Sequence, residues 1–175
     1  QIGLAEALAQ KVNTGKVEND ELDSAGLEVN TADFHNSRGI ELAEKGAFDA
    51  AVSNYNQALQ IRPDYAEVYN NLGLVLMKKG QLNLARKNFE RAVEIKPDFA
   101  VGHFNLGNYF FKKDNLESAI NSYQAALAID ATYAEVLNNL GNAYSKSKQT
   151  DLALKNYKAA LELKPDYIDA HLNFG

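Results

Sequence analysis

The stretch LNNLGNAY, residues 137–144, has close counterparts in YNNLGLVL at 69–76 and HFNLGNYF at 103–110, and HLNFG at 171–175 ends the chain. The glycines of these stretches are spaced by 34 residues, and one more glycine upstream has the same spacing. The series is Gly39, Gly73, Gly107, Gly141 and Gly175. The sequence therefore contains a repeat, and the fold has to account for its period.

Other positions recur with the glycine and predict two helices followed by a stop. Twelve residues after each of the first four glycines comes an alanine, then an aromatic residue four further on and a second alanine three later. Three of the four repeats end with a proline, which cannot continue a preceding helix: Pro63, Pro97 and Pro165. In the second repeat we expect helices from about Ala66 to Lys79 and Leu82 to Ile95, with Gly80 in the turn between them.

This pattern resembles the tetratricopeptide repeat family, in which a large residue, Leu, Gly, Tyr, Ala, Phe and Pro recur over 34 residues. The resemblance implies an all-α fold, a right-handed superhelical solenoid of helix-turn-helix repeats. Arg38 stands where the first repeat would have Leu, Ala131 replaces the third proline, and the chain has no tryptophan. The resemblance covers four repeats and either the start of a fifth or a capping helix: 32–65, 66–99, 100–133, 134–167 and 168–175.

Composition narrows the classes of function. The net charge of −5 is concentrated in residues 1–31, and the nearly neutral remainder lacks the basic patch that nucleic-acid binding requires. The sequence has no cysteine and no stretch of 18 apolar residues, which favours a cytoplasmic location without membrane insertion. No set of nucleophile, base and orienting group can be assembled, so we expect neither catalysis nor a cofactor.

The asparagines of the opening stretches are expected to face solvent. At 100° per residue, Leu72 and Leu76 lie on the packed side of the second repeat's first helix, and Asn71 points away from it. The same geometry predicts one polar stripe on each first helix. Its members are Asn71 and Lys78, then Asn105, Asn108 and Lys112, then Asn139, Asn142 and Lys146, and finally Asn173.

In tetratricopeptide repeat proteins the first helices line a concave groove. The resemblance therefore implies that asparagines of successive first helices form a ladder along this groove, namely Asn71, Asn105, Asn139 and Asn173. A side-chain amide offers both donor and acceptor to the backbone of an extended peptide. The ladder resembles the asparagine array in the repeat region of O-GlcNAc transferase, which holds peptides by their main chain. The alternative is that these asparagines are an inherited feature of the repeat without a ligand.

Further residues of the first helices have a functional and a structural interpretation. Phe104, Phe111 and Met77 form either an exposed apolar pocket or the seam between adjacent first helices. Lys78, Lys112 and Lys146 either attract an acidic peptide or complement the helix dipole. His35, His103 and His171 are too far apart to share a metal ion, so core packing is expected.

Two segments lie at the ends of the repeat array. Residues 2–12 can form a short amphipathic helix that caps the first repeat or docks elsewhere, and an acidic linker follows it. Gly175 falls inside a first helix, so we expect either a longer protein or an open end that pairs with another copy.

The sequence therefore predicts a non-catalytic scaffold that binds an extended segment of a protein partner in the groove. Two alternatives stay open. The chain is the substrate-presenting region of a larger enzyme such as a glycosyltransferase, or it self-assembles through uncapped ends or its N-terminal helix.

Overall fold

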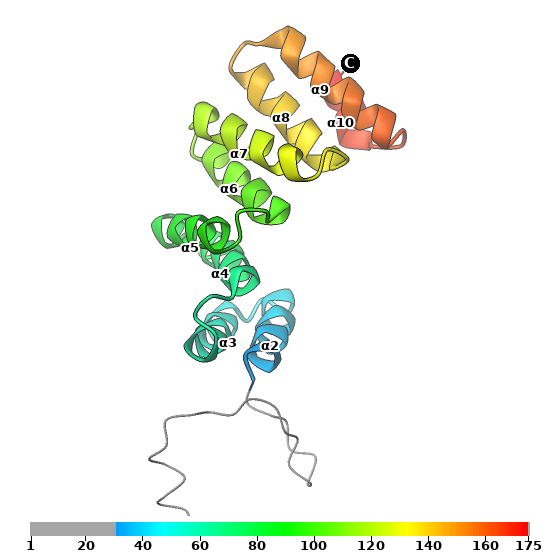
Figure 1. Ribbon diagram of the computed structural model, residues 1–175. Helices are drawn as coiled ribbons and strands as arrows, with labels where there is room; N and C mark the ends of the chain where they lie inside the picture. Colours follow the sequence, from blue (N-terminus) through cyan, green and yellow to red (C-terminus); the bar gives the residue numbers. More distant parts are fainter. Residues whose placement is uncertain (1–30, 175) are drawn as a thin grey trace, which may run out of the picture.

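The computed structural model describes residues 31–174, which are helical apart from short connections (Figure 1). The helices are α2 (Ala32–Glu44), α3 (Phe48–Ile61), α4 (Ala66–Lys78), α5 (Leu82–Ile95), α6 (Ala100–Lys112), α7 (Leu116–Ile129), α8 (Ala134–Lys146), α9 (Thr150–Leu163) and α10 (Ile168–Phe174). The predicted N-terminal helix, most of the acidic linker and Gly175 lie outside the described residues.

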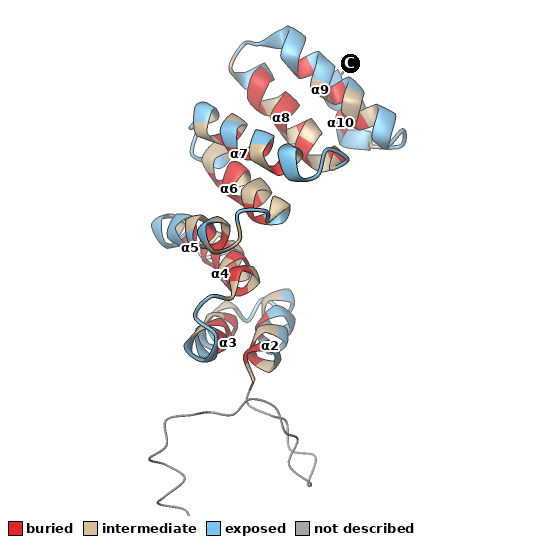
Figure 2. Ribbon diagram, in the orientation of Figure 1, coloured by how far each residue is buried: buried red, intermediate tan, exposed pale blue. Residues whose placement is uncertain are grey.

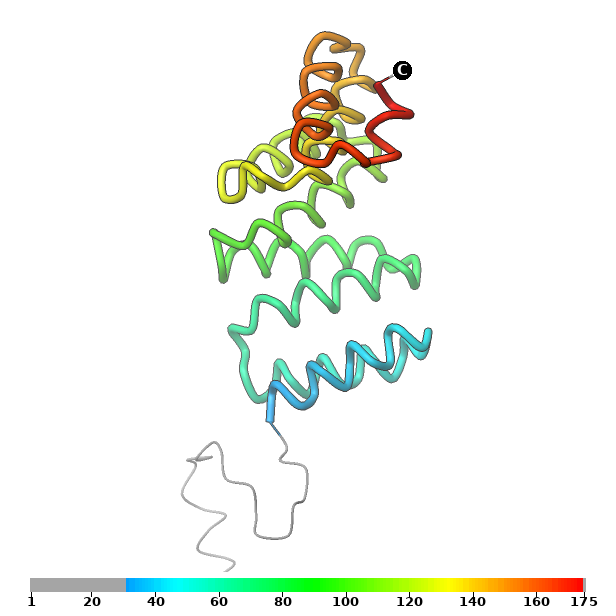
Figure 3. The backbone as a smooth tube through the Cα atoms, turned by 90° about the vertical axis from the view of Figure 1, so that its right-hand side faces the viewer, coloured from blue at the N-terminus to red at the C-terminus, as the bar shows by residue number. Residues whose placement is uncertain are grey.

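The helices form antiparallel pairs that stack along one axis (Figures 1 and 3). Each first helix packs on the second helix of its own pair, and each second helix packs on the next first helix. Successive first helices, from α2 to α10, also contact each other, whereas the second helices do not contact one another within residues 31–174. The array therefore curves with its first helices on the inside, and the predicted all-α solenoid is confirmed.

A glycine and an aromatic ring set the distance between the two helices of each pair. A Cβ atom on Gly107 would lie 2.5 Å from the Tyr123 ring, and one on Gly73 would lie 2.7 Å from Phe89. The rings are almost fully buried, with alanines such as Ala119 beside them. The glycine is therefore required for close approach, since any larger side chain would have to displace the ring.

The inner turns of the four pairs share a left-handed backbone residue. Gly46 and Gly80 have φ values of 76° and 75°, and Asp114 and Lys148 adopt the same region with φ values of 60° and 62°. Glycine enters this conformation without steric cost, whereas other residues are strained there. The first two turns are therefore built with less strain than the last two.

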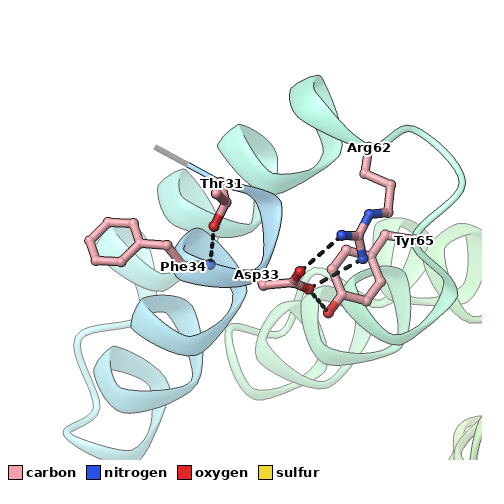
Figure 4. A network of polar contacts seen from close by, with 5 residues as sticks. All are labelled: Thr31, Asp33, Phe34, Arg62 and Tyr65. Atoms are coloured by element: carbon pink, nitrogen blue, oxygen red, sulfur yellow. Dashed lines mark hydrogen bonds and ion pairs between the residues drawn. The ribbon is translucent and has the colours of Figure 1, made fainter. Parts of the chain in front are cut away.

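In the first, second and fourth repeats an ion pair links the start of the first helix to the end of the second helix. Thr31 caps α2 by accepting from the Phe34 amide, and Asp33 accepts from Arg62 at 2.9 Å and from the Tyr65 hydroxyl at 2.6 Å (Figure 4). The bonds from Tyr65 and then Arg62 lower the pKa of Asp33. Equivalent pairs are Glu67–Lys96 and Glu135–Lys164, while the third repeat has Val101 and Asp130 at these positions.

Buried residues lie mainly where helices face each other, as α8 shows, while most of α9 is exposed (Figure 2). They form two apolar clusters, one around Tyr55 and Phe89 and one around Tyr123 and Tyr157, and Phe110 packs against both. The core is therefore a continuous strip along the array. No helix within residues 31–174 is long and apolar enough to cross a membrane.

Replacing Gly107 by Ala tests the close approach. Alanine is the better helix former by about 1 kcal/mol, but its Cβ would meet the Tyr123 ring at 2.5 Å. Overpacking of a core costs about 1–3 kcal/mol, so we expect Gly107→Ala to lower the free energy of unfolding by up to about 2 kcal/mol. Urea denaturation followed by circular dichroism measures this change.

The double variant Gly107→Ala/Tyr123→Leu is the control, because it removes the ring that the new methyl group would meet. Its loss of stability should be smaller than the sum of the two single losses. A Gly107→Ala variant more stable than the parent would show that the glycine is not needed for packing.

Candidate functional site

The inner surface formed by the first helices α2, α4, α6, α8 and α10 contains every residue that the sequence singled out for peptide binding. We call it the first-helix surface. Because successive first helices contact each other, residues one repeat apart in sequence become neighbours across this surface. The polar stripes of adjacent first helices are thus neighbours on this surface.

The ladder asparagines bond to each other across adjacent helices. Asn71 donates from Nδ2 to Oδ1 of Asn36 at 3.2 Å, and Asn105 donates in the same way to Asn70 at 2.9 Å. Asn173 repeats the contact on Asn138 at 3.1 Å. We call this series the amide zipper, and it explains why two asparagines stand side by side in α4 and α8.

The zipper changes partner in the third repeat, where Phe104 occupies the position of the accepting asparagine. Asn139 instead donates to Oδ1 of Asn108 at 2.9 Å. The same oxygen accepts from the Tyr123 hydroxyl at 2.8 Å, and Asn142 accepts from the Tyr157 hydroxyl at 2.8 Å. Asn108 and Asn142 therefore bind the tyrosines that pack on the glycines.

The expectation that the ladder asparagines point away from all packing was wrong. Asn105 is buried with 8% of its surface exposed, Asn71 and Asn139 are half-buried, and Asn173 is exposed. The helical projection considered only the face toward each helix's own partner, whereas the curvature of the array also covers the side facing the preceding first helix. The asparagines line the surface, but one edge of each amide is used within the protein.

Of the two interpretations of Phe104, Phe111 and Met77, the packing of these side chains favours the seam over the exposed apolar pocket. Phe104 packs between the rings of Tyr123 and Tyr133, with centroid distances of 6.2 and 5.2 Å. Phe111 and Met77 are half-buried against the two core clusters. These side chains close the seam between repeats. Contact with the neighbouring helices removes their apolar surface from water, which stabilises the packed position.

The lysines of the stripe lie in the last turns of their helices, where the helix dipole favours cations. Lys146 is paired with Asp114 at 2.7 Å and lies over the Phe111 ring. Lys78 lies 5.8 Å from the centroid of Phe48, and Lys112 is exposed. Lys78 and Lys112 thus remain on the surface, whereas Lys146 already has an acidic partner.

The three histidines differ in burial. His35 is buried as predicted, with 9% exposed, whereas His103 is half-buried and His171 is exposed on the short last helix. His103 and His171 each bind a proline carbonyl oxygen of the preceding connection, Pro97 at 3.0 Å and Pro165 at 2.7 Å. Within residues 31–174 no cluster of His, Asp and Glu side chains forms a potential metal site.

A cavity of about 230 Å³ opens between α2 and α4, which sequence reasoning missed. Ile40, Leu74 and Val75 line it together with the Tyr55 side chain, and Glu44 and Lys78 flank it. The sequence feature that could have indicated this cavity is Ile40. It occupies the position at which the third and fourth repeats have Asn108 and Asn142, the asparagines that bind tyrosine hydroxyls.

Replacing Asn108 by Ala tests the polar contacts at the centre of the surface. The change leaves the Tyr123 hydroxyl and the Asn139 amide without their acceptor, so we expect it to cost about 1–3 kcal/mol of stability. Asn121→Ala on the exposed side of α7 is the matched control, since it changes helix propensity equally. Equal melting temperatures for the two variants would contradict a structural role for Asn108.

Comparisons with known proteins identify the repeats. A family model described as TPR repeat matches residues 39–80 and 107–148, and one described as tetratricopeptide repeat matches 66–99 and 134–167. No curated protein matches the chain.

Solved structures share the architecture. A crystal structure of MamA is 29% identical, with a TM-score of 0.72, and the match covers 78% of this chain and 80% of MamA. A MamA fragment from Desulfovibrio magneticus is 25% identical, with a TM-score of 0.70, over 79% of this chain and 78% of the fragment. PilF of Pseudomonas aeruginosa is 22% identical, with a TM-score of 0.77, over 82% of this chain and 65% of PilF, and shows the fold alone.

Proposed function

Because the chain belongs to the tetratricopeptide repeat family and is a protein-interaction scaffold, we propose that it binds an extended segment of a partner protein along the first-helix surface. The binding is non-catalytic. It uses main-chain contacts from asparagine amides, supplemented by charge from the exposed lysines.

The observation that carries this proposal is that the zipper leaves part of the Asn71 amide unused at the surface. The bond from Asn71 to Asn36 takes one amide hydrogen, so a second N–H and the carbonyl oxygen of Asn71 are available at a half-exposed position. The zipper also fixes the orientation of each amide. A pre-oriented amide loses less entropy when it binds a peptide.

The spacing of the rungs suits an extended chain. Neighbouring packed helices lie about 8–10 Å apart, and an extended peptide advances about 3.3 Å per residue. One rung therefore meets every third peptide residue or so. Peptide groups at this interval present C=O and N–H groups to the surface whatever their side chains are, so affinity depends weakly on peptide sequence.

The charges favour an acidic segment. Lys78 and Lys112 are exposed on the first-helix surface, whereas Lys146 is neutralised by Asp114. Exposed ion pairs contribute at most about 1 kcal/mol each, and each net hydrogen bond contributes about 0.5–1.5 kcal/mol. Four rungs and two lysines therefore give at most about 8 kcal/mol before ordering costs, which corresponds to binding weaker than about 1 μM.

Selection of random 12-residue peptides by phage display, followed by fluorescence anisotropy with the selected peptides, tests the proposal. We expect Asn71→Ala to weaken binding by about two- to tenfold, since it removes one rung. Asn36→Ala is the matched control, because it breaks the same zipper bond but leaves the Asn71 amide in place.

Comparison of the two variants separates ligand contact from scaffold stability. Both should lower the melting temperature by a similar amount, but Asn71→Ala should weaken peptide binding more than Asn36→Ala, which removes only the pre-orientation of the Asn71 amide. Equal affinities of Asn71→Ala and the parent would show that the ladder does not contact peptides.

Self-association is a second candidate function, favoured by the apolar side chains exposed on α10. Ile168 and Leu172 are 71% and 75% exposed, and Phe174 is 44% exposed. A patch of this kind is typical of an interface.

Light scattering over a range of concentrations tests self-association. We expect the parent chain to dimerise as its concentration rises, and the Leu172→Lys variant to remain monomeric. Leu84→Lys changes an exposed leucine of α5 as the control, and a parent that stays monomeric would contradict this candidate.

A further inference from the structure

The cavity between α2 and α4 contains a hydroxyl group that has no internal partner. In the third and fourth repeats the hydroxyls of Tyr123 and Tyr157 donate to Asn108 and Asn142, both at 2.8 Å. Tyr55 is the aligned tyrosine of the first repeat, and its hydroxyl has no hydrogen-bond partner within the described residues. The first repeat is thus unlike the other two that carry this tyrosine.

The reason is the residue opposite the ring. Ile40 occupies the position of Asn108 and Asn142, and its side chain offers no acceptor. The second repeat avoids the problem with an apolar pair, Phe89 and Leu74. The first repeat therefore combines a tyrosine, as in the third and fourth repeats, with an apolar residue opposite it, as in the second repeat. The cavity lies at this position.

The Tyr55 hydroxyl is accessible from the cavity. Tyr55 is only 2% exposed and lines the cavity, yet no fully buried side-chain oxygen or nitrogen within residues 31–174 lacks a partner. The hydroxyl is therefore not fully buried, and the cavity is the space between α2 and α4 that Tyr55 lines. Burial and the nearby Glu44 raise the pKa of Tyr55 to about 12, so the group keeps its proton and can donate at neutral pH.

The remaining groups of the cavity define what fits it. Ile40, Leu74 and Val75 supply apolar walls, while the carboxylate of Glu44 and the amide oxygen of Asn71 supply acceptors. A ligand must therefore have an apolar stem, accept a bond from the Tyr55 hydroxyl and donate one to the acceptors.

Charged and purely aliphatic groups match less well. Glu44 and Lys78 flank the cavity with opposite charges, so neither a carboxylate nor an ammonium group gains net attraction there, and either would lose hydration between the apolar walls. An aliphatic side chain would cover the Tyr55 hydroxyl without offering it an acceptor, which is costly for a polar group. A neutral carboxamide on a short methylene stem meets all the requirements.

We propose that this cavity is a specificity pocket for a glutamine side chain of the bound peptide. The glutamine carbonyl oxygen accepts from the Tyr55 hydroxyl, its amino group donates to Glu44 or Asn71, and its methylene groups contact the apolar walls. The assignment rests on the proposed peptide-binding function and adds a preference for one residue type at the N-terminal end of the array.

Small capped amino acids test the pocket without a known partner. We would titrate the ¹⁵N-labelled chain of residues 1–175 with N-acetyl-glutamine N-methylamide and with the leucine and glutamate analogues, and follow amide shifts by NMR. The glutamine probe should shift Ile40, Ala43 and Leu74 saturably at millimolar concentration, and the other two probes should bind about tenfold more weakly.

Two variants isolate the hydroxyl. Tyr55→Phe keeps the ring and removes the donor, so the glutamine probe should lose about tenfold in affinity while the leucine probe is unaffected. Ile40→Asn supplies the internal acceptor that Asn108 gives Tyr123, and should abolish binding while raising the melting temperature. Tyr157→Phe, in a repeat whose hydroxyl is already bonded, is the matched control and should not change probe binding.

The outcomes separate this proposal from the peptide-binding proposal. Equal binding of the glutamine probe to Tyr55→Phe and the parent, or shifts spread over all repeats, would overturn the glutamine pocket. If the selected 12-residue peptides bind but show no preference for glutamine, only the pocket fails. If the glutamine probe binds at Ile40 and no peptide binds the first-helix surface, the pocket stands and the peptide-binding function fails.

Discussion

The contact between an aromatic ring and a glycine determines the spacing of each helix pair, and the rest of the array depends on that spacing. The ring covers the glycine so closely that no Cβ atom fits, as between Gly141 and Tyr157. The two helices of each pair are thereby drawn together, while neighbouring second helices stay apart. The difference in spacing bends the stack, and bending brings the first helices into contact with each other.

Contact between first helices imposes a second constraint, because their facing sides are polar. A buried amide without a partner is costly, so each asparagine that becomes covered needs a bond to its neighbour. The zipper from Asn105 to Asn70 meets this need inside the protein. It also holds the amides in one orientation, so the structural role of the asparagines and the proposed role in peptide binding are compatible.

The sequence was sufficient to predict the architecture but not the contacts of the first-helix surface. The recurrence of glycine, alanine and aromatic residues predicted the helices of the second repeat within one residue of Ala66–Lys78 and Leu82–Ile95. The position of Asn71 in a single helix could not reveal its partner Asn36, which lies on the preceding repeat, and the position of Phe104 could not reveal its contacts with Tyr123 and Tyr133, which lie outside its own helix. Their burial depends on the curvature of the whole stack, which a helical projection does not contain.

The differences between the repeats show how one architecture produces a surface that varies along its length. A tyrosine on the second helix requires an acceptor on the first, and Asn108 and Asn142 supply one, whereas Phe89 needs none and faces Leu74. Phe104 displaces one zipper asparagine, and Asn139 consequently moves its bond to Asn108. Within residues 31–174 the tyrosine left without such an acceptor is Tyr55, opposite Ile40, so the proposed specificity pocket lies where a residue departs from the repeat pattern.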